Sequence, residues 1–82
     1  MTNNGSGSTL SQRIHECIAL ASACQPGPER DQYFAELSGL QDVEAGRSMN
    51  YVRFGSKAEQ AAYERGYSDG RTLLRITKGG AL

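Results

Sequence analysis

Several residue types are scarce or missing in this chain. Its 82 residues include no tryptophan, one histidine, two cysteines and two prolines. One histidine and two cysteines are too few to supply the paired ligands of a zinc site, so we expect no metal and no cofactor. No apolar run approaches the roughly 18 residues of a membrane span, and the start, MTNNGSGSTL, lacks the pattern of a signal peptide. We therefore expect a cytoplasmic protein with no membrane partner, and the small size suggests a bacterial or phage origin.

The formal net charge is zero, but the charges are unevenly distributed. Residues 1–46 contain two basic and six acidic side chains, whereas residues 47–82 contain seven basic and three acidic ones. One explanation is that the acidic half packs against the basic half of the same chain or of a second copy. The other is that the basic half presents a surface to RNA, DNA or an acidic protein.

Apolar residues recur at helical spacing in three segments, which predicts an all-α, three-helix domain over residues 9–78. Residues 1–8 have nothing to bury and should form a disordered tail, and residues 79–82 should form a C-terminal tail. At this length a chain buries only about 60% of its extended surface, so a partner or a second copy would add stability.

Helix boundaries are marked by capping signals. The first helix should follow a Thr9 and Gln12 capping box and cover residues 10–24. Pro28 should open the second helix and Gly46 should stop it, with Gly39 as a weak point in its interior. The capping box SKAE, residues 56–59, should start the third helix, which we expect to reach about residue 76.

The segment RSMNYVRFG, residues 47–55, does not keep a helical period. Its alternation of side chains near residues 50–55 predicts a possible short extended piece. A lone strand cannot form a sheet, but it could pair with its own copy or add to the edge of a partner's sheet.

The third helix has a stripe of small residues. Ala62, Gly66 and Gly70 are four apart and therefore lie on one face, with Tyr63 and Tyr67 along its edge. Each interior glycine costs a helix about 1 kcal/mol relative to alanine, so the pair indicates close approach of another backbone. Either another helix of the same chain fills this groove, or a second copy or a partner does.

The string AYERGYSDG, residues 62–70, resembles the A-x-x-R-G-Y-x-x-G opening of ribosome modulation factor, a small bacterial protein that binds the ribosome. It is also similar to the A-x-x-x-G-x-x-x-G helical repeats of flagellar and type III export regulators that dimerise. The Cys-Pro-Tyr stretch that follows the first helix of ribosome modulation factor does not occur after Gly70. Because unrelated families share the string, it indicates helix packing, and we assign the chain to neither family.

No constellation of residues predicts catalysis. His15 and Cys17 are two apart on a helix and point to different sides, so they cannot act as a nucleophile and its base. Acidic pairs such as Asp42 and Glu44 have no implied pocket, and we expect them to be solvated or at helix ends. The glycine pattern lacks the lysine and hydroxyl residue of a phosphate-binding loop. We therefore expect the protein not to be an enzyme.

These observations predict a small regulatory or inhibitory protein that binds a larger protein or complex and forms a homodimer. Arg71 and Arg75 either complement the helix dipole or extend a basic surface. The expected partner-binding residues are Tyr51, Arg53, Phe54, Tyr63, Gly66, Tyr67, Gly70, Arg71 and Arg75. The alternative is a ribosome- or RNA-binding modulator that uses the basic half, with tyrosine and phenylalanine rings stacking on bases.

Overall fold

The computed structural model describes the backbone of residues 9–80 and the side chains of residues 9–76. This part of the chain forms three α-helices and a 3-10 turn: α1 (Leu10–Ala23), α2 (Pro28–Glu44), η1 (Tyr51–Arg53) and α3 (Lys57–Gly80). The predicted three-helix, all-α class is therefore confirmed. The expected tail at residues 1–8 lies outside the described residues, as do residues 81–82 and the side chain of Lys78. None of the helices described is long and apolar enough to cross a membrane.

The helix ends follow the predicted signals. At the start of α1, the Gln12 N–H donates to the Thr9 hydroxyl at 3.1 Å, and the Thr9 N–H donates to the Gln12 side chain at 2.8 Å. Ser56 and Glu59 make the same reciprocal pair before α3. Gly46 stops α2 with a φ of 76°, a left-handed conformation that favours glycine. Helix α3 continues through Gly80, two residues into the segment expected to be a tail.

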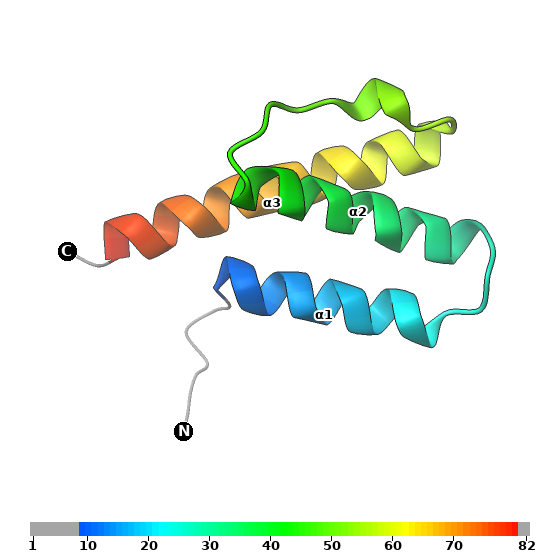
Figure 1. The fold of residues 1–82 in the computed structure, drawn as a ribbon, viewed down its shortest axis with the longest axis horizontal. Helices are drawn as coiled ribbons and strands as arrows, with labels where there is room; N and C mark the ends of the chain where they lie inside the picture. The colour runs from blue at the N-terminus through cyan, green and yellow to red at the C-terminus, as the bar shows by residue number, and fades with distance from the viewer. Residues whose placement is uncertain (1–8, 81–82) are drawn as a thin grey trace.

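Helices α1 and α2 form an antiparallel hairpin, whereas α3 runs in the same direction as α2 (Figure 1). The central element is α2, which packs extensively against both other helices, while α1 and α3 meet only briefly. Because α2 and α3 are parallel, the chain has to return along their length before α3 can begin. Residues 45–56 make this return, and we call them the crossover segment.

Two apolar clusters form the interior, and α2 contributes to both. The cluster between α1 and α2 contains Leu10, Ile14, Cys17, Leu37, Leu40 and Val43, with Tyr67, Leu73 and Leu74 of α3 packed against it. The cluster between α2 and α3 contains Ala35, Ala62 and Tyr63, with Phe54 and Tyr67 at its edge. Small residues predominate in the second cluster, so these two helices come closer together than large side chains would allow.

The glycine stripe of α3 is filled from within the chain. A methyl group added to Gly66 would overlap the backbone carbonyl of Glu36, and one added to Gly39 would overlap the carbonyl of Tyr63. One added to Gly70 would lie 3.1 Å from Val43 Cβ. Gly39 is therefore not a weak point of α2. It is the partner of Gly66 at the point where the two backbones touch.

The possible extended piece near residues 50–55 is instead a 3-10 turn. The Phe54 N–H donates to the Tyr51 carbonyl at 3.1 Å and closes η1. No strand occurs within residues 9–80, so the segment has no sheet edge to join. The crossover segment instead packs against α3, and its backbone forms hydrogen bonds with side chains of that helix.

We predict that Gly66→Ala lowers the free energy of unfolding by at least about 2 kcal/mol, because the added methyl forces two helix backbones apart. Gly70→Ala should cost less, since it meets a side chain that can shift. Chemical denaturation followed by circular dichroism measures both.

The matched control is Gly55→Ala, because nothing lies within 4 Å of a methyl group at Gly55. It should change the unfolding free energy by no more than about 0.5 kcal/mol. Equal effects at Gly66 and Gly55 would contradict the close approach of α2 and α3.

Candidate binding site

A buried carboxylate organises the space between α2, α3 and the crossover segment. Asp42 of α2 is only 2% exposed. Its Oδ1 accepts from Arg47 Nε at 3.0 Å, and its Oδ2 accepts from Arg53 Nη2 at 3.2 Å and from the Tyr63 hydroxyl at 2.5 Å. Asp42 lies in the last turn of α2, which agrees with the expected helix-end position, but it is buried and not solvated. The partners that make burial possible lie 5, 11 and 21 residues away in sequence.

The Tyr63 hydroxyl links the crossover segment to this carboxylate. It accepts from the Asn50 N–H at 2.8 Å while it donates to Asp42. The ring of Phe54 lies 5.2 Å from the Tyr63 ring, and the guanidinium of Arg53 lies 5.1 Å from both ring centres. These contacts attach the middle and the end of the crossover segment to α3.

A second tyrosine fastens the start of the same segment. The Tyr67 hydroxyl donates to the Arg47 carbonyl at 2.7 Å. Tyr63 and Tyr67 are one turn apart on α3, with ring centres separated by 6.1 Å. The crossover segment is therefore tied to α3 on successive turns.

These surroundings shift the pKa values of the buried pair. Burial alone would raise the pKa of Asp42, but the hydrogen bonds from Tyr63 and Arg47 and the charges of Arg53 and Arg47 outweigh it and hold the pKa below 3.8. Burial, together with the hydrogen bond to Asp42, raises the pKa of Tyr63 above 10.0. Asp42 is therefore ionised and Tyr63 is neutral at pH 7.

Ion pairs link α1, α2, the crossover segment and α3 to one another. Asp42 pairs with Arg47 and Arg53 as described above, and Glu36 pairs with Arg65 at 3.8 Å. Arg13 of α1 pairs with both Glu36 and Asp69, the latter at 3.6 Å. Four of these pairs join residues 1–46 to residues 47–82, as the first of the two explanations predicts for these residues.

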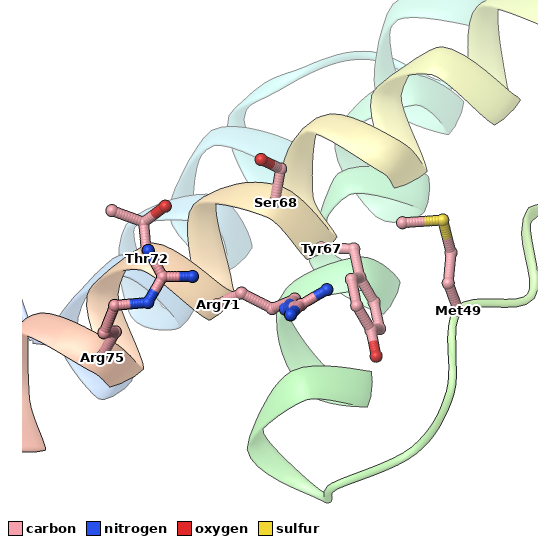
Figure 2. Close-up of a pocket in the computed structure, with 6 residues that line it drawn as sticks. All are labelled: Met49, Tyr67, Ser68, Arg71, Thr72 and Arg75. Atoms are coloured by element: carbon pink, nitrogen blue, oxygen red, sulfur yellow. The ribbon is translucent and has the colours of Figure 1, made fainter.

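A shallow pocket of about 290 Å³ lies between the crossover segment and α3. Met49 lines it from the crossover segment, and the remaining lining residues follow one face of α3 (Figure 2): Tyr67, Ser68, Arg71, Thr72 and Arg75. Both arginines are exposed, and neither forms an ion pair with a described residue. The pocket therefore combines two available cations, two hydroxyl groups, a thioether and an aromatic ring.

The structure divides the predicted partner-binding residues into two groups. Tyr67, Arg71 and Arg75 line the pocket, and Tyr51 and Arg53 lie partly exposed on the crossover segment. Phe54 is half-buried against Tyr63.

Tyr63, Gly66 and Gly70 are buried between α2 and α3 and offer no surface to a partner. This burial corrects their predicted place on a contact surface, because α2 already occupies the glycine face.

Sequence reasoning missed two exposed apolar residues of the crossover segment. Met49 is 43% exposed and Val52 is 71% exposed. The sequence did contain an indication of them. Both are apolar residues in a stretch that keeps no helical period, so they have no helix face through which to be buried.

The remaining chemically interesting side chains are apart from one another. The Cys17 thiol is buried and donates to the Tyr33 carbonyl at 3.2 Å, while His15 is exposed. Burial, followed by the charge of Glu36, raises the pKa of Cys17, which keeps the thiol protonated and unreactive. Within the described residues, no cluster of three or more histidine, cysteine or acidic side chains is placed to hold a metal ion.

Comparisons with protein-family models, with curated proteins and with solved structures returned no match for this chain. Function therefore has to be argued from the geometry of the residues themselves.

We predict that stability falls as the pH drops through the lowered pKa of Asp42. A carboxyl group with a lowered pKa contributes stability above its ordinary pKa, here 3.8, and loses that contribution as it is protonated in the folded protein. Asp42→Asn should lower the free energy of unfolding at pH 7 by about 1–3 kcal/mol, because Tyr63 and two arginines lose a charged acceptor. In this variant the unfolding free energy should also depend less on pH in the acid range. If the unfolding free energy of this variant decreased with falling pH as much as that of the unmodified protein, other carboxyl groups would be responsible for the decrease.

We predict that Tyr63→Phe loosens the crossover segment without unfolding the helices. The variant leaves the Asn50 N–H without its acceptor and should cost about 1–2 kcal/mol. Native-state amide hydrogen exchange should accelerate at Asn50 and Phe54 more than at Leu40. Uniform acceleration throughout the chain would contradict the role given to this hydroxyl.

Proposed function

We propose that this protein is a small, non-enzymatic regulator or inhibitor that acts in the cytoplasm by occupying the surface of a larger protein or complex. The proposed contact surface consists of the exposed side of the crossover segment and the adjoining face of α3. Its main residues are Met49, Tyr51, Val52, Tyr67, Arg71 and Arg75. The unpaired thiols of Cys17 and Cys24 fit a reducing compartment.

The observation that supports the proposal is the exposure of apolar side chains on a segment that is held firmly in place. Val52 and Met49 keep 71% and 43% of their surface exposed, yet the segment that presents them is fixed through Tyr63 and Tyr67. A preorganised surface loses less conformational entropy on binding than a flexible one. Methionine, tyrosine and arginine are also enriched in protein interfaces.

The proposed surface is continuous along α3. Asn50 contacts Tyr63, Arg47 contacts Tyr67, and the pocket extends the surface to Arg75. The part of α3 that supports this surface, residues 63 to 75, spans roughly 18 Å. That length suits one side of a small interface.

The glycine stripe was one of the surfaces through which the expected homodimer could form. Because α2 already fills this stripe, self-association would have to use another surface, and the contact surface proposed here does not require it.

The ribosome- or RNA-binding alternative is weakened by the internal ion pairs. Arg13, Arg47, Arg53 and Arg65 all face acidic side chains of the same chain, so four of the arginines are already compensated, and Arg71 and Arg75 remain available. Nucleic-acid binding that depends on phosphate contacts uses roughly 6–10 of them.

We expect the double variant Met49→Ser, Val52→Ser to lose partner binding at least tenfold, because it removes the exposed apolar residues from the centre of the surface. Its unfolding free energy should change by no more than about 0.5 kcal/mol per site. The measurement is capture of the partner from nuclease-treated lysate of the native host, using tagged protein and quantitative mass spectrometry.

Leu20→Ser provides the matched control, since Leu20 is 46% exposed on α1, away from the proposed surface. This variant should capture the same protein as the unmodified chain. Equal loss in both variants, or no loss in the double variant, would refute the proposed surface.

A further inference from the structure

We propose that the pocket between Met49 and α3 binds an acidic peptide segment of the partner, with a carboxylate held by Arg71 and Arg75 and a neighbouring apolar side chain resting on Met49 and Tyr67. This inference rests on the proposed function, because it specifies the chemistry of the partner for the same surface.

The cationic part of the pocket consists of two arginines one helical turn apart. At a spacing of i and i+4, their side chains leave α3 as neighbours, with Cβ atoms about 5–6 Å apart. Neither forms an ion pair with a described residue, and none of the six residues that line the pocket is acidic. A planar guanidinium can donate two parallel hydrogen bonds to a carboxylate, so the available donors match this group.

Two residues with hydroxyl groups, Ser68 and Thr72, also line the pocket. Thr72 lies next to Arg75, whereas the Ser68 hydroxyl points away from the Arg71 guanidinium (Figure 2). Serine and threonine hydroxyls can donate to an oxygen that the guanidinium groups leave unsatisfied. The site therefore offers several donors to an anion.

The other end of the pocket is apolar. Met49 extends from the crossover segment toward the ring of Tyr67, whose hydroxyl is already used by the Arg47 carbonyl (Figure 2). A thioether and an aromatic ring adapt well to an aliphatic side chain. The volume of about 290 Å³ is at the lower limit of ligand pockets and accommodates one or two side chains of a peptide.

The same features favour a peptide over a nucleic acid. Two available arginines would neutralise only about two phosphates, whereas strong phosphate-dependent binding uses several more. A mixed acidic and apolar sequence, in contrast, satisfies both ends of the pocket at once.

The experiment is a titration of ¹⁵N-labelled protein, followed by two-dimensional NMR, with the peptide acetyl-Leu-Glu-Leu-Glu-Leu-amide. The expected result is saturable shifts at the amides of Met49, Ser68, Arg71 and Thr72. The matching glutamine peptide should bind at least about tenfold more weakly, since it lacks the charge-assisted hydrogen bonds. Equal binding of the two peptides would overturn the proposal.

Substitutions of the two arginines test whether the peptide's carboxylate binds in the pocket. Arg71→Gln and Arg75→Gln should each weaken binding of the glutamate peptide by about 5–10-fold. Arg30→Gln is the control, because it removes the same charge from α2, where Arg30 stacks on Phe34 5.3 Å away. An equal loss in Arg30→Gln would indicate a general charge effect and overturn the site.

Two further probes separate the sources of anionic charge. Inorganic phosphate and a 12-nucleotide single-stranded RNA should each shift the same amides less than the glutamate peptide at equal concentration. Tighter binding of the RNA would overturn the peptide assignment in favour of nucleic acid. Failure of every probe, while the Met49 and Val52 variant still loses its partner, would refute this inference and leave the proposed function standing.

Discussion

The structure depends on direct contact between two helix backbones. Gly66 of α3 lies against the Glu36 carbonyl of α2, and Gly39 of α2 lies against the Tyr63 carbonyl of α3. This contact brings two parallel helices close together, and parallel neighbours cannot be joined by a tight turn. The crossover segment is therefore a consequence of the glycine contact, because it must return along α3 to reach the start of that helix. The polar groups of this segment then need partners, which Asp42, Tyr63 and Tyr67 supply.

The Asp42 carboxylate, which lies between α2, α3 and the crossover segment, is both buried and ionised. Burial alone is costly for an ionised group such as this one. Its two arginines come from the crossover segment and remain partly in water, so the cluster is not a fully buried ion pair. The arrangement joins an acidic residue of the first half of the sequence to two basic residues of the second half, and it leaves Arg71 and Arg75 available on α3.

Local signals in the sequence predicted the helices well. The capping boxes at Thr9 and Ser56 and the stop at Gly46 each depend on a few adjacent residues, so a single sequence reveals them. Pairing between distant elements leaves no such local mark. The small-residue stripe of α3 indicated a close neighbour, but only the structure identified that neighbour as α2 through Gly39. For the same reason the burial of Asp42 was not predicted, and of the proposed contact surface only Tyr51, Tyr67, Arg71 and Arg75 were predicted, without Met49 and Val52.

The small-residue stripe also determines whether α3 can slide along α2. A slide of one turn, about 5.4 Å, in one direction would put Ala62 where Gly66 lies, and its methyl group would strike the Glu36 carbonyl. A slide in the other direction would put Leu74 in the place of Gly70, which is already tight against Val43. Either movement would also separate Tyr63 from Asp42. The helix pair therefore has one register, so a change of shape on binding has to come from α1 or the crossover segment, with α2 and α3 as the fixed frame.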